Sequence, residues 1–484
     1  MLIDESQGKY TWQTKVKDVL GNEFQLADEY LTSHVTIKDL LLHRTGLATT
    51  NLPLFAGFPD TLTRKDLTMR LRFLPVSGLF RDEYNYNNWM YALAGRVAEV
   101  MGGASWEELL HQRIFQPLQM NDSRVIGYNV DVDADNFALP YVQLRNEIVR
   151  SDPVIYKMTA TEPAIAIASS ADDMAKWLSW HVRGGVTSDG HVTLKKSCLQ
   201  EMYAPHMAVP DLTYIKKPQF PISINNYGYG YGWTTATYRG YSMVWHSGII
   251  LGYLTLLTLL PDLDIGIFIS TNGPGTMNTS FARSEVSYYI TDLLLRLDPW
   301  LNNANACQFP QEWENVTDDP SEDSVLVHGE LKGLQNFVGQ YGNVLFGDIT
   351  VTKNGSNELL VNYGRVTGKL HKTKEDHVLM MDILGVLEFV THVGNDVLYI
   401  NTTFAKADES GQYQEILVSS PSMTDSIIMV FKRGVTFSHL SDPLTSGSTT
   451  SNFAFILYFM THFFLFLLVF PEGIFINTNE RNIL

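Results

Sequence analysis

The order of the periodic patterns along this chain of 484 residues limits the architectures that it can adopt. Helical spacing with matching start and stop signals predicts four helices, over residues 35–42, 86–100, 105–115 and 171–182. Two apolar runs follow, at 253–260 and 265–270, joined by a Pro-Asp-Leu-Asp turn that is typical of a hairpin. Helical spacing returns over residues 281–297. Helices, then antiparallel strands, then a closing helix predict an α+β domain.

Three of these helices begin with a capping signature, a Ser or Thr placed three residues before an acidic residue. The pairs are Thr36 with Asp39, Ser105 with Glu108, and Ser170 with Asp173. Gly46 and Gly184 supply the stop signals for the first and last of these helices, and Pro117 follows the pattern of residues 105–115. The helix starts are therefore the most sharply predicted features of this part of the chain.

Short alternating runs replace the helical pattern in the second part and predict a small all-β domain. The predicted strands are 349–352, 359–363, 378–381, 387–390, 397–401, 415–418 and 427–431. Asn354 and Gly355 predict a hairpin between the first two. A chain of this length usually exceeds one core. We predict a first domain over 1–298, a linker rich in Asn, Pro and acidic residues over 299–330, the all-β domain over 331–435 and a tail over 436–484.

Bulk composition describes a globular protein, with 45% hydrophobic and 18% charged residues. The net charge of −17 argues against nucleic acid as a partner, because a phosphate backbone would be repelled. An acidic surface could meet cations or a mineral surface, but on charge alone an ordinary acidic bias is the favoured interpretation. Cys198 and Cys307 do not make a disulfide framework, and either one bridge or two free thiols fits the sequence.

Two kinds of signal bear on location. The first residues lack the basic start and apolar stretch of a signal peptide, whereas residues 453–470 are apolar apart from Thr461 and His462 and just long enough to span a membrane. A mispredicted terminal exon would also explain that stretch. Glycosylation triplets, which permit a secreted location, start at Asn121, Asn278, Asn315, Asn354 and Asn401. We expect a secreted or extracellular protein, with a C-terminal membrane anchor as the alternative.

Two triplets separated by 160 positions carry the chemical signature, Tyr86-Asn87-Asn88 and His246-Ser247-Gly248. With their surroundings they resemble the second and third motifs of the serine β-lactamase and penicillin-binding-protein superfamily, in the branch of class C β-lactamases and D-Ala-D-Ala carboxypeptidases (peptidase family S12). Residues 40–47 and 170–178 resemble scaffold segments of the same family. The resemblance covers roughly residues 1–298. It implies a β-lactamase/transpeptidase-like domain with an antiparallel sheet flanked by helices, followed by a lipocalin-like β module.

The resemblance also assigns roles on the helical side of the cleft. Tyr86 matches the tyrosine that relays protons near the nucleophile, and Asn88 matches the asparagine that holds the substrate amide. A phenol, with an ordinary pKa near ~10, serves as a base only if nearby cations lower that value. Without the family lysine, Tyr86 is expected to stay neutral. The structural alternatives are a core tyrosine for Tyr86 and a helix N-cap for Asn88.

On the strand side, the resemblance makes His246 the group that meets the substrate carboxylate. Gly248 lets the substrate backbone approach, Ser247 lies between them, and Ile249 supplies an N–H group to the oxyanion. The alternative for His246 is a satisfied core histidine beside Trp245. Histidine in place of lysine points towards the esterase and peptidase-like members of the family.

The nucleophile motif of the family, Ser-x-x-Lys, has no credible match. Ser6 and Lys9 have the spacing, but Gly8 between them disfavours a helix, and the segment resembles the stretch just after the nucleophile helix. By that register the serine, and the first two strands of the sheet, are expected upstream of Met1. Without those strands a central strand would become an exposed edge.

Three hypotheses follow. The first is a non-catalytic extracellular or shell-matrix glycoprotein, similar to the gigasin-type proteins of mollusc shell, with matrix or mineral components as partners. The second is an active serine hydrolase, an esterase or D-Ala-type peptidase acting on a small acyl or peptide substrate through an acyl-enzyme, of which this sequence is an incomplete record. The third is a membrane-anchored ectodomain. No cofactor is implied, and the histidines lack the paired spacing of metal ligands.

Overall fold

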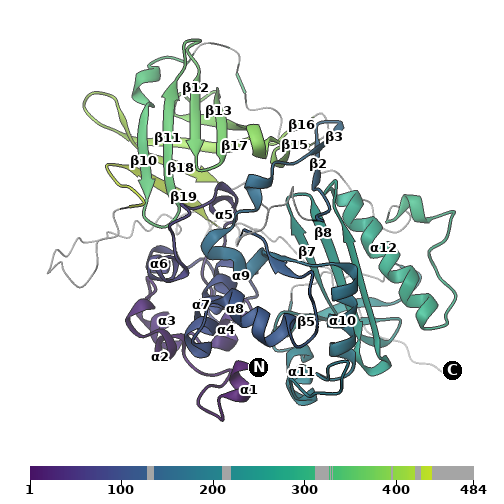
Figure 1. The fold of residues 1–484 in the computed structure, drawn as a ribbon. Helices are drawn as coiled ribbons and strands as arrows, with labels where there is room; N and C mark the ends of the chain where they lie inside the picture. The colour runs from purple at the N-terminus through teal and green to yellow at the C-terminus, as the bar shows by residue number, and fades with distance from the viewer. Residues whose placement is uncertain are drawn as a thin grey trace, which may run out of the picture. The chain divides into compact units, whose positions relative to one another are not determined.

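The computed structural model describes residues 1–127, 136–209, 220–310, 326–327, 329, 331–393, 396–419 and 427–438. Helices dominate the first part of the chain, a five-stranded sheet follows, and an eight-stranded barrel comes last (Figure 1). The helices are α1 (Leu2–Glu5), α2 (Val16–Leu20), α3 (Glu29–His34), α4 (Ile37–Leu41), α5 (Leu52–Ala56), α6 (Arg64–Arg70), α7 (Asn88–Gly102), α8 (Trp106–Leu110), α9 (Glu162–Ile165), α10 (Ala171–Val182), α11 (Lys196–Tyr203) and α12 (Met277–Leu294). The predicted α+β class is confirmed.

The predicted helix starts are confirmed where a capping signature was present. Thr36 and Asp39 form a reciprocal capping box at α4, and Ser105 and Glu108 form another at α8. The Ser170 side chain accepts a hydrogen bond from the backbone of Asp173, and α10 has the bounds that its spacing predicts. The helix predicted over 105–115 changes character after Leu110, because residues His111–Phe115 form a π-helical turn.

The start of α7 corrects a sequence-based alternative. Asn87, not Asn88, is the N-cap, and its side chain accepts from the backbone N–H of Trp89 (3.0 Å). Asn87 is buried, and its amide nitrogen donates to the carbonyls of Leu47 (3.2 Å) and Ala48 (3.0 Å). These carbonyls belong to residues 47–51, a segment that we call the strap. Two adjacent asparagines leave the cap position ambiguous in the sequence, and burial of the first one decides it.

The central sheet is antiparallel, in the order β5-β6-β7-β8-β9. Its strands are Ile224–Tyr229, Thr234–Tyr238, Tyr241–Ile250, Tyr253–Leu260 and Ile265–Thr271. β6 pairs with β7 only from Tyr241 to Trp245, so among the described strands the stretch from His246 to Ile250 is open on the side of β6. β9 pairs only with β8 within the described residues, in agreement with the expected exposed edge.

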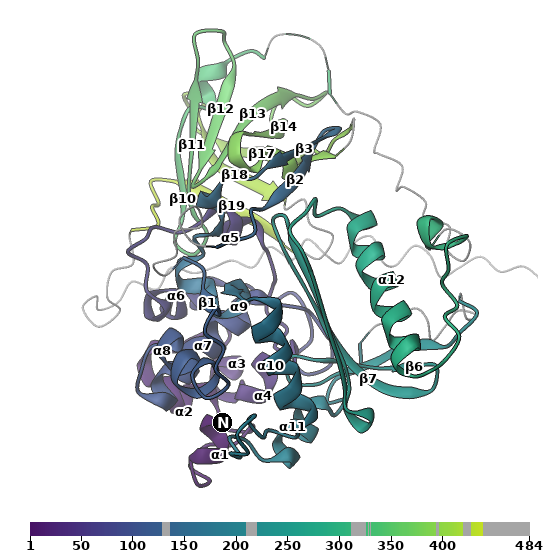
Figure 2. The same cartoon turned by 45° about the vertical axis from the view of Figure 1, so that its right-hand side comes forward.

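Helices cover both faces of this sheet (Figure 2). Thr258 on β8 contacts Ser287 of α12 through their hydroxyls (3.3 Å), and its neighbour Leu259 packs in one apolar cluster with Leu178 of α10. Consecutive residues of a strand point to opposite faces. α10 and α12 therefore lie on opposite faces of the sheet, and α10 lies on the same side as the rest of the helical region.

The last part forms a closed antiparallel barrel in the order β10-β11-β12-β13-β14-β17-β18-β19. Its strands are Gly339–Asn343, Gly347–Lys353, Leu359–Tyr363, Val366–Lys372, Val378–Leu384, Ile400–Ala407, Tyr413–Ser419 and Ile428–Arg433. The small all-β domain and the hairpin at Asn354 are confirmed. The strand predicted at 387–390 is wrong, because that segment is a 3-10 helix, Gly385–Val390. The strand predicted at 397–401 spans a break, since one short strand ends at Val397 and β17 begins at Ile400.

Apolar packing continues from the helical region into the barrel. Phe346 of the barrel makes an edge contact with Trp89 of α7, and Phe437 stacks on Phe58. One core cluster contains residues of both regions, and residues 1–440 form one compact unit. The predicted division into a first domain that ends at residue 298 and a second that begins at residue 331 therefore stays a prediction.

Two further findings concern properties that the sequence left open. Both cysteines, Cys198 and Cys307, are free thiols. No helix in the described ranges is long and apolar enough to cross a membrane, and the apolar stretch 453–470 lies outside those ranges.

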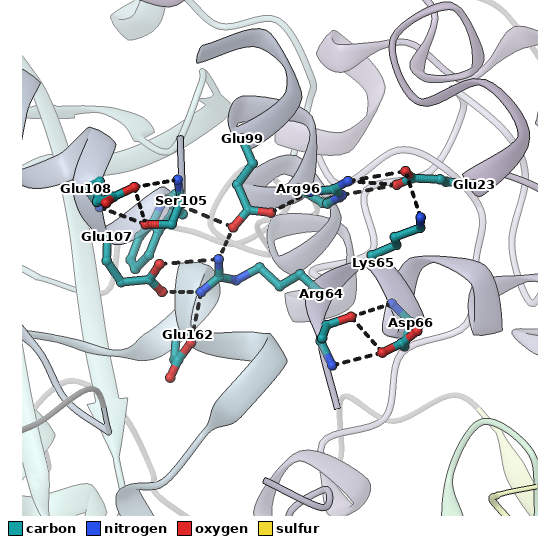
Figure 3. Close-up of polar contacts among 12 residues, drawn as sticks. Glu23, Arg64, Lys65, Asp66, Arg96, Glu99, Ser105, Glu107, Glu108 and Glu162 are labelled. Carbon is teal, nitrogen blue, oxygen red and sulfur yellow. Dashed lines mark hydrogen bonds and ion pairs between the residues drawn. The ribbon is translucent and has the colours of Figure 1, made fainter. Parts of the chain in front are cut away.

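A buried ion-pair network ties four helices together (Figure 3). Arg64 of α6 contacts Glu99 of α7, Glu107 of α8 and Glu162 of α9, the last at 2.9 Å. Arg96 bridges Glu99 (3.1 Å) and Glu23 (2.9 Å), and Lys65 approaches Glu23 (3.6 Å). Three cations therefore face four carboxylates. Burial, together with nearby Glu107, raises the pKa of Glu162 to about 7 against the pull of Arg64.

The first prediction concerns the cap of α7. Asn87→Ala removes the cap and both hydrogen bonds to the buried strap carbonyls, of which Leu47 keeps only a long bond from Asn85 (3.4 Å), so we expect the free energy of unfolding to fall by about 2–4 kcal/mol. Asn88→Ala removes one partly buried hydrogen bond and should cost less than about 1.5 kcal/mol. Urea denaturation measures both values. An equal loss in the two variants would contradict the assignment of the cap to Asn87.

The second prediction concerns Glu162. Its folded-state pKa lies above its ordinary value of 4.5, so the bound proton stabilises the fold fully below about 4.5, and this contribution is lost as the pH rises through 7. After a discount for solvent screening we expect a loss of roughly 2 kcal/mol across that window. Urea denaturation from pH 4.5 to 8 should show a smaller decline in Glu162→Gln. The exposed control Glu409→Gln should keep the wild-type decline, and a Glu162→Gln profile as steep as wild type would contradict this account.

Candidate active site

The two sequence motifs meet in space. The ring of Tyr86, in the turn before α7, lies 6.3 Å from the ring of His246 on β7, measured between centroids. His43, which follows α4, packs 4.2 Å from Tyr86, and the hydroxyl of Tyr229 at the end of β5 lies 3.1 Å from Nε2 of His246. Segments from four parts of the chain thus form one cluster of aromatic and imidazole rings.

His43 joins this cluster to the start of α7. Its Nδ1 accepts a hydrogen bond from the backbone N–H of Asn87 (2.9 Å), so the neutral ring carries its proton on Nε2. Nε2 is buried without a hydrogen-bond partner in the described part of the chain. Burial, aided by the nearby imidazole of His246, lowers the pKa of His43 to about 3. His43 is therefore neutral.

His246 is held in the opposite tautomer. Its Nδ1 lies 2.7 Å from the carbonyl oxygen of Ser247, which can only accept, so Nδ1 carries the proton. Nε2 is then the acceptor for the Tyr229 hydroxyl. Burial lowers the pKa of His246, and the hydrogen bond to Ser247 opposes this effect only in part. The ring is thus a neutral group with both nitrogens engaged, not a cation ready for a carboxylate.

The tyrosines of the cluster are neutral as well. Burial raises the pKa of Tyr86, although solvent limits the effect because 37% of this residue is exposed. Burial also raises the pKa of Tyr91, whose hydroxyl donates to the carbonyl of Leu41 (3.0 Å), and that of Tyr229. The shift for Tyr86 is in the direction expected without a neighbouring lysine. At neutral pH the cluster can hydrogen-bond a ligand, but Tyr86 is a poor base.

The remaining strand residues lie where β7 has no neighbour on the side of β6. Ile249 is 59% exposed, and Ser247 is half-buried. A side chain at position 248 would meet the hydroxyl of Thr255 at 2.4 Å, so close packing against β8 is one physical reason for glycine there. Arg283 of α12 donates to the carbonyl of Gly248 (3.3 Å), which fixes the backbone at this point.

Asn88 makes its hydrogen bond to the strap. Its Nδ2 donates to Oδ1 of Asn51 at 3.0 Å. The structure therefore brings Tyr86 and His246 together and places Asn88 one residue beyond the cap of α7, with its carboxamide oriented by Asn51.

Ser6 and Lys9 do not form a nucleophile pair. α1 ends at Glu5, and Ser6 is its C-cap, with its hydroxyl donating to the carbonyl of Ile3 (2.7 Å) and accepting from the N–H of Tyr10 (3.0 Å). Gln7 and Gly8 both have positive φ, so Ser6 and Lys9 flank a turn and do not share a helical turn. This geometry supports the interpretation that their spacing is coincidental.

Two members of the cluster, Tyr91 and Tyr229, were not predicted as site residues. The aromatic, glycine-rich stretch 227–233 is the signal that could have indicated Tyr229, whereas no local spacing relates Tyr91 to Tyr86. No group of three or more His, Cys, Asp or Glu side chains within the described ranges is arranged to hold a metal ion.

Comparison with known proteins agrees with this geometry. A family model described as Beta-lactamase matches residues 1–286. An Unguisins hydrolase from Aspergillus campestris is 25% identical over 62% of this chain and 54% of its own length, and Gigasin-6 from Magallana gigas is 28% identical over 34% of the chain and 55% of its own length. The chain thus spans about half the length of these relatives.

A solved structure shows the fold. An octameric penicillin-binding protein homologue from Pyrococcus abyssi superposes with a TM-score of 0.51 at 18% identity, over 89% of this chain and 84% of that one. The match of the family model to more than half of the chain, with the cluster of Tyr86 and His246 inside it, shows that this protein belongs to the β-lactamase family.

Proposed function

We propose that this chain binds a small acyl or peptide ligand in the cleft at Tyr86 and His246 and does not cleave it. The observation that carries the proposal is the contrast between two parts of the family signature. Tyr86, Asn88 and His246 stand in ordered, matched surroundings. Ser6 and Lys9, which alone match the spacing of the nucleophile motif, are separated by a turn.

The open edge of β7 supports binding. From His246 to Ile250 the backbone has a partner strand in β8 and none on the side of β6 among the described strands. An extended peptide can add to such an edge through main-chain hydrogen bonds. The phenol of Tyr86 beside this edge offers a neutral hydrogen-bonding group, which suits an uncharged amide or ester, and the neutral ring of His246 lies next to it.

An extracellular setting, with matrix or mineral components as partners, belongs to the same proposal. The net charge of −17 and the similarity to Gigasin-6 over part of the chain support it. The glycosylation triplets at Asn121, Asn278 and Asn401 lie on exposed asparagines and are compatible with a glycoprotein. Mass spectrometry of the native protein tests it, since glycans on these asparagines require passage through the secretory route. Unmodified asparagines in material from cell extracts would count against it.

The second candidate is an active serine hydrolase that works through an acyl-enzyme. The hydrogen bond between Tyr229 and His246 favours it, because an ordered pair of proton-carrying groups beside the cleft is a typical component of acyl-transfer sites. The name of the relative from Aspergillus campestris, Unguisins hydrolase, points the same way.

Labelling with a fluorescent penicillin separates the two candidates. We expect reversible binding in a polarisation assay and no fluorescent band after denaturing electrophoresis, because Ser6 and Lys9 flank a turn and do not form the serine–lysine pair that an acyl-enzyme needs. Tyr86→Phe, which keeps the ring and loses the hydroxyl, should weaken binding by about fivefold. A covalent band that fluorophosphonate pretreatment abolishes would establish the hydrolase, and no binding at all would refute the ligand-binding proposal.

Binding should not depend on a histidine cation. Because burial lowers the pKa of His246 below its ordinary value of 6.5, the ring gains its charge only at lower pH. The affinity for a ligand with a free carboxylate should therefore change by less than about twofold between pH 8 and pH 6.5. Calorimetric titration with an acylated D-Ala-D-Ala peptide measures this. A severalfold gain at pH 6.5 that disappears in His246→Gln would show that the imidazolium pairs with the carboxylate.

A further inference from the structure

Three side chains outside the two sequence motifs form a chain of proton-carrying groups. Lys38, in the first turn of α4, directs its amine at the imidazole of His206, which follows α11, and Nζ lies 3.3 Å from Nδ1. On the other side of the ring, Nε2 lies 2.9 Å from the carbonyl oxygen of Glu201 and 3.2 Å from a carboxylate oxygen of the same residue. A carboxylate, an imidazole and an amine in this order are the components of an activated nucleophile.

The protons of this group can be counted from its geometry. Both oxygens of Glu201 act as acceptors, so Nε2 of His206 carries a proton. Nδ1 of the neutral ring is then an acceptor for the amine of Lys38. If both groups were charged, an N–H of the imidazolium and an N–H of the ammonium would oppose each other across 3.3 Å. In this geometry the amine and the imidazole therefore share one proton between two bases.

The surroundings of Lys38 favour the free amine. Burial lowers the pKa of Lys38, and the nearby cation of Arg44 lowers it further, against the opposing pull of Glu201 and Asp39. Asp39 is itself paired with Arg44 at 2.8 Å. Lys38 is only half-buried, so solvent still reaches the amine and moderates the shift. At neutral pH a larger fraction of this amine is unprotonated than in a fully solvated lysine.

Backbone and ring contacts hold the amine and the imidazole in place. The backbone N–H of Lys38 donates to the carbonyl of Trp12 (2.9 Å), and that of His206 donates to the carbonyl of Tyr229 (3.0 Å). The ring of His206 stacks on Tyr231 at 4.7 Å, and Tyr231 stacks on Trp12 at 4.1 Å. Nζ of Lys38 lies 5.9 Å from the centre of the Tyr231 ring. The amine thus has a fixed proton acceptor and an aromatic wall beside it.

We propose that Lys38 is a nucleophilic amine that condenses with aldehydes, with His206 as the group that takes and returns the protons. Lysine amines form Schiff bases with carbonyl compounds when desolvation or a neighbouring cation keeps them unprotonated, and Lys38 meets both conditions. The ring of Tyr231 beside the amine suits an aromatic aldehyde. This proposal does not depend on the ligand proposed for the cleft at Tyr86 and His246.

The reaction balances without an oxidant or a reductant. Nζ attacks the carbonyl carbon, a C–N bond forms, and the π electrons move to the oxygen. Nδ1 of His206 takes a proton from the nitrogen and delivers it to that oxygen, which gives a carbinolamine. A second proton reaches the hydroxyl through the imidazole, the C–O bond breaks and water leaves. The nitrogen then gives up its remaining proton, so the products are an imine on Lys38 and one water molecule.

Reductive trapping tests the proposal. Sodium cyanoborohydride converts an imine with benzaldehyde into a stable benzyl-lysine, and peptide mass spectrometry measures its rate of formation at each lysine. At pH 7 we expect Lys38 to be modified about tenfold faster than Lys353, an exposed lysine at the end of β11. His206→Gln can accept a hydrogen bond but cannot take the proton. It should reduce the advantage of Lys38 to less than about twofold.

The dependence on pH separates proton transfer from a structural role of His206. In wild type the rate at Lys38 should reach its plateau at a lower pH than the rate at Lys353, because the pKa of Lys38 is lowered. This difference should disappear in His206→Gln. His191→Gln makes the same substitution at a side chain that is 80% exposed and should leave both the rate and the profile of Lys38 unchanged.

Thermal unfolding identifies any variant that has lost its fold, and Lys353 in the same sample serves as the internal standard. If Lys38 in wild type is unmodified, or is modified no faster than Lys353, the proposal is overturned. An advantage of Lys38 that persists in folded His206→Gln with the wild-type pH profile would show that His206 takes no part in the reaction.

Discussion

The hydrogen bond from the backbone of Asn87 to Nδ1 of His43 is the contact on which the candidate site depends. It joins the segment after α4 to the start of α7, and the buried Asn87 side chain extends this junction to the strap. Tyr86, one residue before the bond, is thereby placed against His43 and faces His246 on the sheet. A motif of three polar and aromatic residues is therefore held by backbone and core contacts.

Burial has opposite consequences in the two polar clusters of the molecule. Around His43 it leaves imidazoles and phenols uncharged, because no cation or carboxylate among the described residues pairs with them, and desolvation favours the neutral form. Around Arg64 the charged side chains are paired with groups of opposite sign. The network has one carboxylate more than it has cations, and Glu162 is the carboxylate whose pKa is raised. The cluster around Tyr86 and His246 is thus neutral, while the charges that brace α6 to α9 lie in a separate network.

Local signals in the sequence predicted those parts of the fold whose stability is local. The capping pairs at Thr36 and Ser105 fixed helix starts, because a cap is satisfied within four residues. The segment 387–390 was misread as a strand, since a short apolar run looks the same in a 3-10 helix. The sequence does not predict β10 and β13, because Gly342 and Gly368 interrupt the alternation of apolar and polar residues in these strands. Each glycine is nevertheless required, since a larger residue would collide with an adjacent segment of the same chain.

The site was predictable only where the family resemblance supplied a motif. Tyr86 and His246 were identified in this way, and the structure brings them together. The N-cap of α7 is Asn87 and not Asn88, and Asn88 donates to Asn51 instead. Both features depend on contacts between segments some forty residues apart. No local pattern encodes such contacts, and the same holds for Tyr229, which reaches His246 from another strand.

Nitrogen NMR of the histidine side chains in protein labelled with ¹⁵N-histidine tests the central claim most directly. The account predicts that His43 and His246, identified by loss of their signals in single variants, are both neutral, with the proton on Nε2 in His43 and on Nδ1 in His246. Neither should show a titration midpoint at or above about 6.5. A charged ring in either residue at pH 7, or the same tautomer in both, would contradict the neutral, cross-braced cleft described here.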